Sequence, residues 1–556
     1  MSAFQVTRRR LLAGAGGAAL LGATGLAGCS KSSSDEANSA TVNDSVKLPT
    51  YVRYQGVKPD LPGTDAGVDP AFRYFPTDNP SVVPEKPGNG GSVSGMANIY
   101  YAVPPGPDRN SYWQGLNERL GTSLQLQMVS NADYTTKFAT TIAGNDLPDM
   151  LQTPNGSPPP VANLPQLLDK RFTNLSEYLS GDAIKEYPNL ANIPTASWKS
   201  TIFNGGIYGI PIPRGLIGSY NFIRADLFEA KGLPTSPKGY DELLSVAKEL
   251  TDPKSRRWAF GLMSQLRQIF AGMNDEPTVW KYENGTLTHT YETEQFKQSV
   301  TDMMAFWKAG VVHPDAFNTA LPFKQLFNAG TVAINGHDGY PGWTQYILDN
   351  ASNSSFKLGL MEEYKRDGSG LAPWHLGSGI FSFTMLKKQD GANNGKDKIT
   401  TLLRVLNWLA APFGTSEYLY RLFGQKGVDH TVDAKNNPSL TATGTANTVL
   451  PIRYLADSPY TIYQPGRPGD ADIQHGYQSK EIPTGRANPT TGLFSNTAAT
   501  DNATADKNFN DGVNEIIQGR QPMSNLDGLI STWKSSVGDK MRNDYLPQLE
   551  GGAQPK

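Results

Sequence analysis

The sequence predicts an α/β fold that begins with a parallel sheet, in a chain long enough for two lobes. Between residues 96 and 144, apolar residues follow strand, helix, strand and helix spacing in turn, an order typical of α/β folds. The 556 residues exceed what one hydrophobic core serves, so two lobes of roughly 200 residues each are expected. No internal repeat is present, which disfavours solenoids and propellers.

The local pattern places the first elements. Residues 96–101 and 124–128 are expected to be strands, and between them Trp113, Leu116 and Leu120 recur at helical spacing. A second helical stripe carries Tyr134, Phe138 and Ile142 and ends at Gly144. Further helices are predicted over residues 240–250, 296–307 and 399–406. Trp307 and Trp408 lie on apolar stripes of helical segments, so both side chains are expected to belong to the core.

The N-terminal residues resemble an export signal followed by a lipid anchor. Arg8, Arg9 and Arg10 precede a Gly- and Ala-rich apolar run that ends near residue 27, which predicts a signal peptide over residues 1–28. The paired arginines followed by two leucines resemble a twin-arginine signal, and a general secretory signal is the alternative. The Leu-Ala-Gly-Cys sequence at 26–29 resembles a lipobox, and Cys29 is the only cysteine in the chain. We therefore expect acylated Cys29 to hold the protein on the outer face of the cytoplasmic membrane.

Residues 29–95 are rich in Ser, Asn, Pro and Gly and are interpreted as a tether, although the aromatic stretch 51–76 leaves open that part of it lies along the folded body.

The chain has a formal charge of −2, and removal of the three signal arginines would leave −5. This balance does not favour nucleic acid as a partner.

Several segments, taken together, resemble the family 1 extracellular solute-binding proteins, in particular the large lipoprotein members that serve oligosaccharide importers. They are Asp-Leu-Pro-Asp at 146–149, Gly-Gly-Ile-Tyr-Gly-Ile-Pro at 205–211, the Ile-Arg-Ala-Asp-Leu-Phe segment that opens 223–234, Tyr-Asp-Glu-Leu at 240–243, and the Gly-rich segment 420–430. The resemblance extends from about residue 96 to 545, with a weak region from roughly 431 to 510.

The resemblance implies two α/β lobes joined by a hinge, with a ligand held in the cleft between them. Residues 96–212 with about 325–390 are expected in the N-terminal lobe, and 213–324 with about 391–556 in the C-terminal lobe. The expected partners are a carbohydrate and the permease subunits of an ABC importer, with the membrane reached through Cys29. A monomer is expected, no cofactor is implied, and some members of the family bind calcium.

A saccharide site needs flat aromatic rings beside planar polar groups, because sugars present apolar faces ringed by hydroxyls. Trp113 follows the loop after the first strand, at the edge of a parallel sheet where ligands bind. Residues 338–343 carry an acid and two rings between glycines and a proline, which predicts a loop that exposes Trp343. The candidate ligand residues are Trp113, Arg214, Tyr220, Asn221, Trp280, Asp338, Tyr340, Trp343, Trp374 and His375.

Two alternatives remain open from the residues alone. A secreted glycoside hydrolase or lyase would need two carboxylates across a glycosidic bond, and Asp338 with Glu362 or Glu363 is the candidate pair, although no sequence spacing supports it. The six histidines show no metal-ligand spacing, and no nucleophile elbow or phosphate loop is present. A binding lipoprotein for a peptide or another non-sugar solute is the second alternative.

Overall fold

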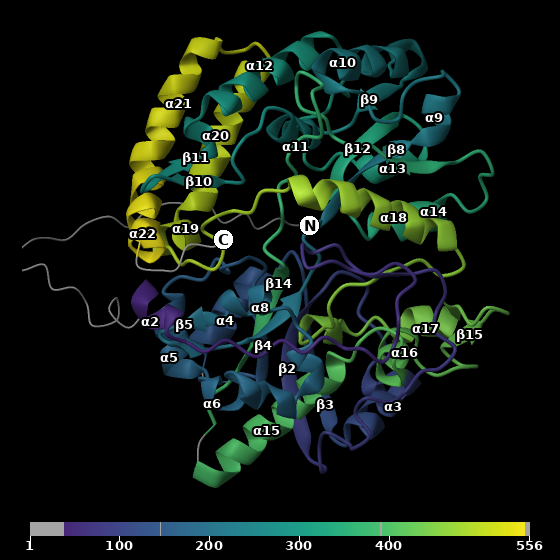
Figure 1. The fold of residues 1–556 in the computed structure, drawn as a ribbon, viewed down its shortest axis with the longest axis vertical. Coiled ribbons are helices and arrows are strands. Elements are labelled where there is room, and N and C mark those ends of the chain that lie inside the picture. The colour runs from purple at the N-terminus through teal and green to yellow at the C-terminus, as the bar shows by residue number, and fades with distance from the viewer. Residues whose placement is uncertain (1–37, 145, 390–391, 551–556) are drawn as a thin grey trace, which may run out of the picture.

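A computed structural model describes residues 38–144, 146–389 and 392–550 as two α/β lobes stacked one above the other (Figure 1). The predicted signal peptide and Cys29 lie outside these residues. No helix in the described part of the chain has the length and apolar character of a membrane span.

A five-stranded sheet forms the centre of the first lobe. Its strand order is β3-β2-β4-β14-β7, with β2 parallel to β3 and β4, and β14 antiparallel to both β4 and β7. The sequence predicted a fold that begins with parallel strands, because strand and helix segments follow in turn, and this prediction is confirmed. The strands are β2 (Ser92–Ile99), β3 (Ser123–Ser130), β4 (Met150–Gln152), β7 (Ile210–Pro213) and β14 (Ile380–Leu386).

Helices cover both faces of this sheet, because successive residues of a strand point to opposite faces and both sets are apolar. On β2, Val93 and Ala97 join one hydrophobic cluster and Met96 joins another. The helices of this lobe are α3 (Ser111–Leu120), α4 (Tyr134–Ala143), α5 (Leu164–Arg171), α6 (Ser176–Leu179), α7 (Pro188–Ala191), α8 (Thr195–Lys199), α15 (Ala392–Leu409), α16 (Ser416–Phe423) and α17 (Ala442–Asn447).

A four-stranded sheet forms the second lobe, with strand order β13-β8-β12-β9. Strand β8 runs antiparallel to β13 and β12, and β12 runs parallel to β9. Adjacent residues of β8 again serve different clusters, since Ile223 packs on one face and Phe222 on the other. The strands are β8 (Ser219–Arg224), β9 (Trp258–Phe260), β12 (Val332–Gly339) and β13 (Leu358–Leu360), beside a hairpin of β10 (Trp280–Glu283) and β11 (Thr286–His289).

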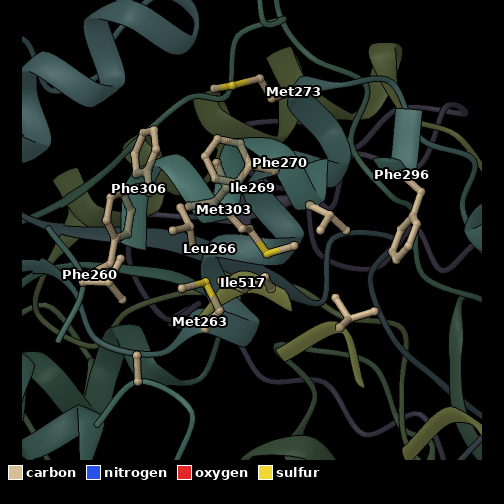
Figure 2. Packing of buried hydrophobic residues seen from close by; sticks show 14 of the residues in the cluster. Phe260, Met263, Leu266, Ile269, Phe270, Met273, Phe296, Met303, Phe306 and Ile517 are labelled. Carbon is tan, nitrogen blue, oxygen red and sulfur yellow. The ribbon is translucent and has the colours of Figure 1, made fainter. Parts of the chain in front are cut away.

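The largest apolar cluster of the second lobe joins its sheet to helices that are distant in sequence. Figure 2 shows side chains of α11 (Met263–Met273) and α12 (Glu294–Lys308) packed together with Ile517 of α20 (Asn502–Ile517). The remaining helices beside this lobe are α9 (Ala225–Glu229), α10 (Gly239–Leu250), α13 (Phe323–Asn328), α14 (Gly342–Asp349), α18 (Pro468–Glu481), α19 (Asn496–Thr500), α21 (Leu526–Trp533) and α22 (Asp539–Glu550).

The division of the chain between the lobes differs from the predicted one in two segments. Strands β12 and β13 belong to the second sheet, so residues 332–360 do not join the first lobe. Helix α15 and residues up to Ala456 pack in the same core as Val93 of the first lobe, so this part of 391–556 does not join the second. The chain crosses between the sheets by the segments 214–218, 361–379 and 457–467, so the second and third crossings lie later in the chain than the sequence indicated.

The described part of the predicted tether lies on the folded body. Strand β1 (Ala71–Phe72) pairs in parallel with β17 (Ile462–Tyr463), and Phe75 packs against Phe413. The backbone of Val52 donates to the carbonyl of Ala191. Residues 38–91 therefore cover the lobes rather than form a free linker.

Candidate ligand site between the lobes

A cavity of about 490 Å³ lies between the lobes, within the range of small-molecule sites. Its first-lobe wall is the loop after β4, with Pro158, Pro159 and Pro160. The opposite wall comes from the second lobe and from the C-terminal helices. Among its residues are Arg267, Glu276, Trp280, His289, Tyr291, His375, Asn488, Thr490, Asn502, Asp506, Asn510 and Tyr545.

In the cavity wall, Arg267 and Glu276 form an ion pair, and His289 is neutral. Arg267 donates two hydrogen bonds to Glu276, with Nη1 to Oε1 at 3.0 Å and Nη2 to Oε2 at 2.7 Å. Burial, together with the charges of Arg542 and Arg267, lowers the pKa of His289 to about 3. Asp506 also lines the cavity and accepts hydrogen bonds from Asn502 and from the indole of Trp533, and burial raises the pKa of its carboxyl.

One acceptor in this wall is free. The side-chain oxygen Oδ1 of Asn502 is buried and has no hydrogen-bond partner among the described residues. The amide nitrogen of the same side chain donates to Asp506 at 2.8 Å, which fixes the orientation of the amide. A ligand hydroxyl in the cavity would satisfy this oxygen.

A second group of polar residues lies where the crossing segments meet. We define the arginine–tyrosine cluster as Arg214, Tyr340, Arg421, Arg453, Tyr454, Asp457 and Tyr460. Asp457 accepts from all three arginines: Arg421 Nη1 at 2.7 Å, Arg453 Nη2 at 3.1 Å and Arg214 Nη1 at 3.2 Å. Burial alone would raise the pKa of Asp457, but the guanidiniums of Arg453, Arg421 and Arg214 outweigh it and lower the pKa to about 2.

The cluster joins the two lobes. Tyr454 packs on the core of the first lobe and Tyr340 on a core of the second. The rings of Tyr340 and Tyr460 lie 4.4 Å apart, and the guanidinium of Arg214 lies 5.0 Å from the ring of Phe381 in β14. Charged and aromatic side chains are therefore gathered at the hinge.

The structure brings four of the predicted ligand residues to these two places. Trp280 and His375 line the cavity, and Arg214 and Tyr340 belong to the arginine–tyrosine cluster. Trp280 is nevertheless almost fully buried, with its ring against His289. The Nε2 of His375 lies 3.0 Å from the carbonyl of Glu276, which orients the imidazole.

The other predicted ligand residues are buried in the lobes, which corrects their assignment. Trp113 lies on the inner face of α3, where its indole donates to the carbonyl of Leu124. Tyr220 is buried in β8, and Asn221 beside it donates to Glu363 at 2.7 Å. Trp374 stacks on His337, with ring centroids 4.5 Å apart.

The expected loop at 338–343 is also wrong. Strand β12 extends to Gly339 and α14 begins at Gly342, so only two residues separate them. Trp343 is 1% exposed in the core of the second lobe. Asp338 is buried, with hydrogen bonds from Tyr346 and Asn335. Neither side chain lines the cavity between the lobes.

With this geometry established, solved structures of the same architecture can be compared. An extracellular solute-binding protein from Bifidobacterium longum subsp. infantis matches over 84% of this chain and 98% of its own, with a TM-score of 0.61 and 12% identity. The FusA substrate-binding protein of a Streptococcus pneumoniae ABC transporter, solved with kestose, matches over 83% and 98%, with a TM-score of 0.58 and 15% identity. This chain has the fold of the extracellular solute-binding proteins. The predicted two-lobed fold class is confirmed.

Two curated relatives agree with the predicted resemblance to the family 1 solute-binding proteins. The polygalacturonan/rhamnogalacturonan-binding protein YtcQ of Bacillus subtilis is 26% identical over 304 residues, which cover 52% of this chain and 58% of the relative. The lipoprotein LipO of the same organism is 24% identical over 223 residues, covering 37% and 42%. The chain thus spans about half the length of the curated relatives it matches. No family model matches the chain.

Sequence reasoning missed most of the cavity wall and of the arginine–tyrosine cluster. The prolines at 158–160 were a visible signal, because three consecutive prolines exclude helix and central strand. Asn502, Arg453 and Tyr460 carry no periodic pattern that distinguishes them from surface residues. They follow the point where the family resemblance weakens, so no motif selected them.

Proposed function

We propose that this protein captures an oligosaccharide between its lobes and delivers it to the permease of an ABC importer. The observation that carries the proposal is the cavity of about 490 Å³, whose wall includes the prolines at 158–160 from one lobe and Trp280, Tyr291 and His375 from the other. A ligand that contacts both walls stabilises the closed arrangement of the lobes over the open one. The permease then has a ligand-dependent shape to recognise.

The chemistry of the wall favours a polyhydroxylated ligand over a peptide or an apolar solute. Rings offer surfaces for the apolar faces of sugars, and the amides of Asn488, Asn502 and Asn510 offer donors and acceptors for hydroxyls. The free acceptor on Asn502 fits a hydroxyl donor in particular. The similar proteins agree, since YtcQ is named for binding polygalacturonan and rhamnogalacturonan and FusA was solved with kestose.

Export and anchoring complete the proposal. We propose that the mature chain lies outside the cell with its N-terminus held by a lipid on Cys29, and the twin arginines, the lipobox and a curated relative named a lipoprotein support this proposal. The twin-arginine route predicts that Arg8→Lys with Arg9→Lys stops export. A general secretory signal would tolerate both changes, so normal export of the double variant would decide for that route.

A thermal-shift screen of the purified full-length protein against an oligosaccharide panel tests the function. A ligand at 100 times its Kd adds about 2.7 kcal/mol of stability, which is a readily measured shift. We expect a shift with at least one oligosaccharide and none with peptides of similar size. Incubation with the bound oligosaccharide should leave its length unchanged, and cleavage products would instead favour the glycosidase alternative.

A further inference from the structure

The arginine–tyrosine cluster has more positive than negative charge. The carboxylate of Asp457 accepts hydrogen bonds from Arg214, Arg421 and Arg453. Its single negative charge can neutralise only one of these guanidiniums. Both carboxylate oxygens are used, because Oδ1 accepts from Arg421 and Oδ2 from the other two. Positive charge therefore remains at the hinge.

The nearest further acid does not remove this surplus. Burial raises the pKa of Tyr340 and of Tyr460, and the charge of nearby Asp69 adds to the rise. Burial raises the pKa of Asp69 itself to about 7, against the opposing hydrogen bond from Gln478. The Asp69 carboxyl is thus only partly ionised at neutral pH.

Part of the surplus charge is open to a ligand. The Arg421 side chain is 1% exposed and serves the fold, whereas Arg453 is 42% exposed and Arg214 is 16% exposed. Aromatic rings accompany the two reachable guanidiniums. Phe381 lies 5.0 Å from Arg214, and Tyr454 lies 6.0 Å from Arg453.

The rings form a continuous surface beside these charges. The ring centroids of Phe381 and Tyr454 are 5.3 Å apart, and that of Tyr100 lies 5.5 Å from Tyr454. Tyr100 is 43% exposed, directly after strand β2. An exposed ring beside a guanidinium suits a pyranose that carries an acidic group, because the ring packs on the sugar face while the planar guanidinium pairs with a carboxylate.

We propose that this cluster binds the carboxylate of an acidic saccharide, so that the ligand class of the protein is uronate-containing oligosaccharides. Arg453 and Arg214 bind the carboxylate, and Tyr100 and Tyr454 contact the sugar ring that bears it. The inference rests on the proposed capture of an oligosaccharide between the lobes. It adds that the ligand is anionic, which the wall of the cavity does not require.

The test compares acidic oligosaccharides with their carboxyl-reduced forms, in which each carboxylate becomes a primary alcohol and size and linkage stay the same. Calorimetric titration of the purified full-length protein uses uronate oligomers of several linkages, each beside its reduced partner. We expect at least one uronate oligomer to bind about tenfold or more tightly than its reduced form. We also expect the preference to shrink as salt rises, because opposite charges are screened.

Substitutions in the arginine–tyrosine cluster test whether its arginines cause the preference for the acidic saccharide. Arg453→Gln should reduce the preference for the acidic form to within a few-fold, and Arg214→Gln should act in the same direction. Asp457 keeps Arg421 in both variants, so the fold keeps its buried pair. Arg520→Gln is the matched control, because Arg520 is a well-exposed arginine paired with Glu515 on the surface, and it should change nothing.

The outcomes separate this inference from the proposed function. Equal or tighter binding of the reduced forms would overturn the anionic class and leave oligosaccharide capture intact. A preference that persists unchanged in Arg453→Gln and Arg214→Gln would overturn the role of the cluster. If no saccharide of either kind binds, the proposed function fails and this inference fails with it.

Discussion

The indole Nε1 of Trp343 donates a hydrogen bond to Oδ2 of Asp470, 2.8 Å away. Trp343 lies in α14 of the second lobe, and Asp470 lies in the first turn of α18, just after the chain has crossed from the first lobe. The bond therefore fastens α18 to the second lobe. It gives Trp343 a structural role at the place where the sequence predicted a ligand contact.

Trp343→Ala should cost stability rather than affinity. Truncation removes a side chain that is 1% exposed, leaves a cavity in the core and frees a buried carboxylate from its indole donor. We expect a loss of about 3 to 5 kcal/mol of unfolding free energy. Chemical denaturation measures the loss, and titration with a bound oligosaccharide on the folded fraction should give an affinity within a few-fold of the native value.

Trp343→Phe separates packing from the hydrogen bond, since it keeps an aromatic ring but not the donor. Its cost should be smaller, about 1 to 3 kcal/mol, the value of one hydrogen bond to a charged group, because Asp470 keeps its hydrogen bonds from Arg467. Strong loss of affinity with native stability in either variant would return Trp343 to the ligand site.

The error over Trp343 shows where sequence reasoning stops. Two glycines and a proline at 339–342 correctly indicated a break in regular structure, but the break is a two-residue turn between β12 and α14. Which side of a short turn an indole occupies depends on the partner that covers it. Here that partner is α18, more than a hundred residues later in the chain, and no local pattern encodes the contact.

The elements that were predicted correctly depend on local spacing. Helix α3 spans Ser111–Leu120 and α4 spans Tyr134–Ala143, where the apolar stripes placed them. The division into lobes depends instead on which sheet a strand joins, and β12 joined the second sheet by pairing with β8 and β9. Such long-range pairing is decided by tertiary packing, so periodicity alone does not predict it.

A substitution at Asn502 tests the cavity as the ligand site. Because Oδ1 of Asn502 has no partner among the described residues, Asn502→Ala should lower the affinity for a bound oligosaccharide by roughly 3- to 10-fold, the value of one neutral hydrogen bond. Calorimetric titration measures the change.

The matched control for this position is Asn510→Ala. Asn510 also lines the cavity, but its amide already donates to the carbonyl of Asp506 in its own helix. Its removal should therefore have a smaller effect. Unchanged affinity in Asn502→Ala with a folded protein would remove this part of the cavity from the site.

Cys29→Ser tests the lipid anchor. Without a thiol to acylate, the variant should move from the membrane fraction to the soluble fraction, because stable attachment depends on the buried acyl chains. Cell fractionation followed by immunoblotting measures the distribution, and the melting temperature should stay unchanged. Retention of Cys29→Ser in the membrane fraction would exclude acylation at this residue as the anchor.

Glu481 should make the protein less stable as pH rises. The side chain lies on α18 and is fully buried, and burial together with the nearby charges of Glu363 and Glu362 raises its pKa to about 9. In the unfolded chain a glutamate titrates near 4.3. Between these values the unfolded chain has released its proton and the folded protein has kept it, so rising pH favours unfolding.

Glu481→Gln removes this ionisation while it keeps the shape of the side chain. Below about pH 4 the carboxyl is protonated in both states, so the variant and the native protein should have nearly equal stability. At pH 7 the variant should be more stable by roughly 1 to 3 kcal/mol, because the native protein alone must keep a carboxyl protonated to stay folded. Denaturation midpoints measured from pH 4 to pH 8 give the difference.

Glu515→Gln, at an exposed surface position, is the control and should give no gain at any pH. A gain of the same size at pH 4 and pH 7 would assign the effect to packing, and a loss at pH 7 would show that the native carboxylate is ionised and stabilising.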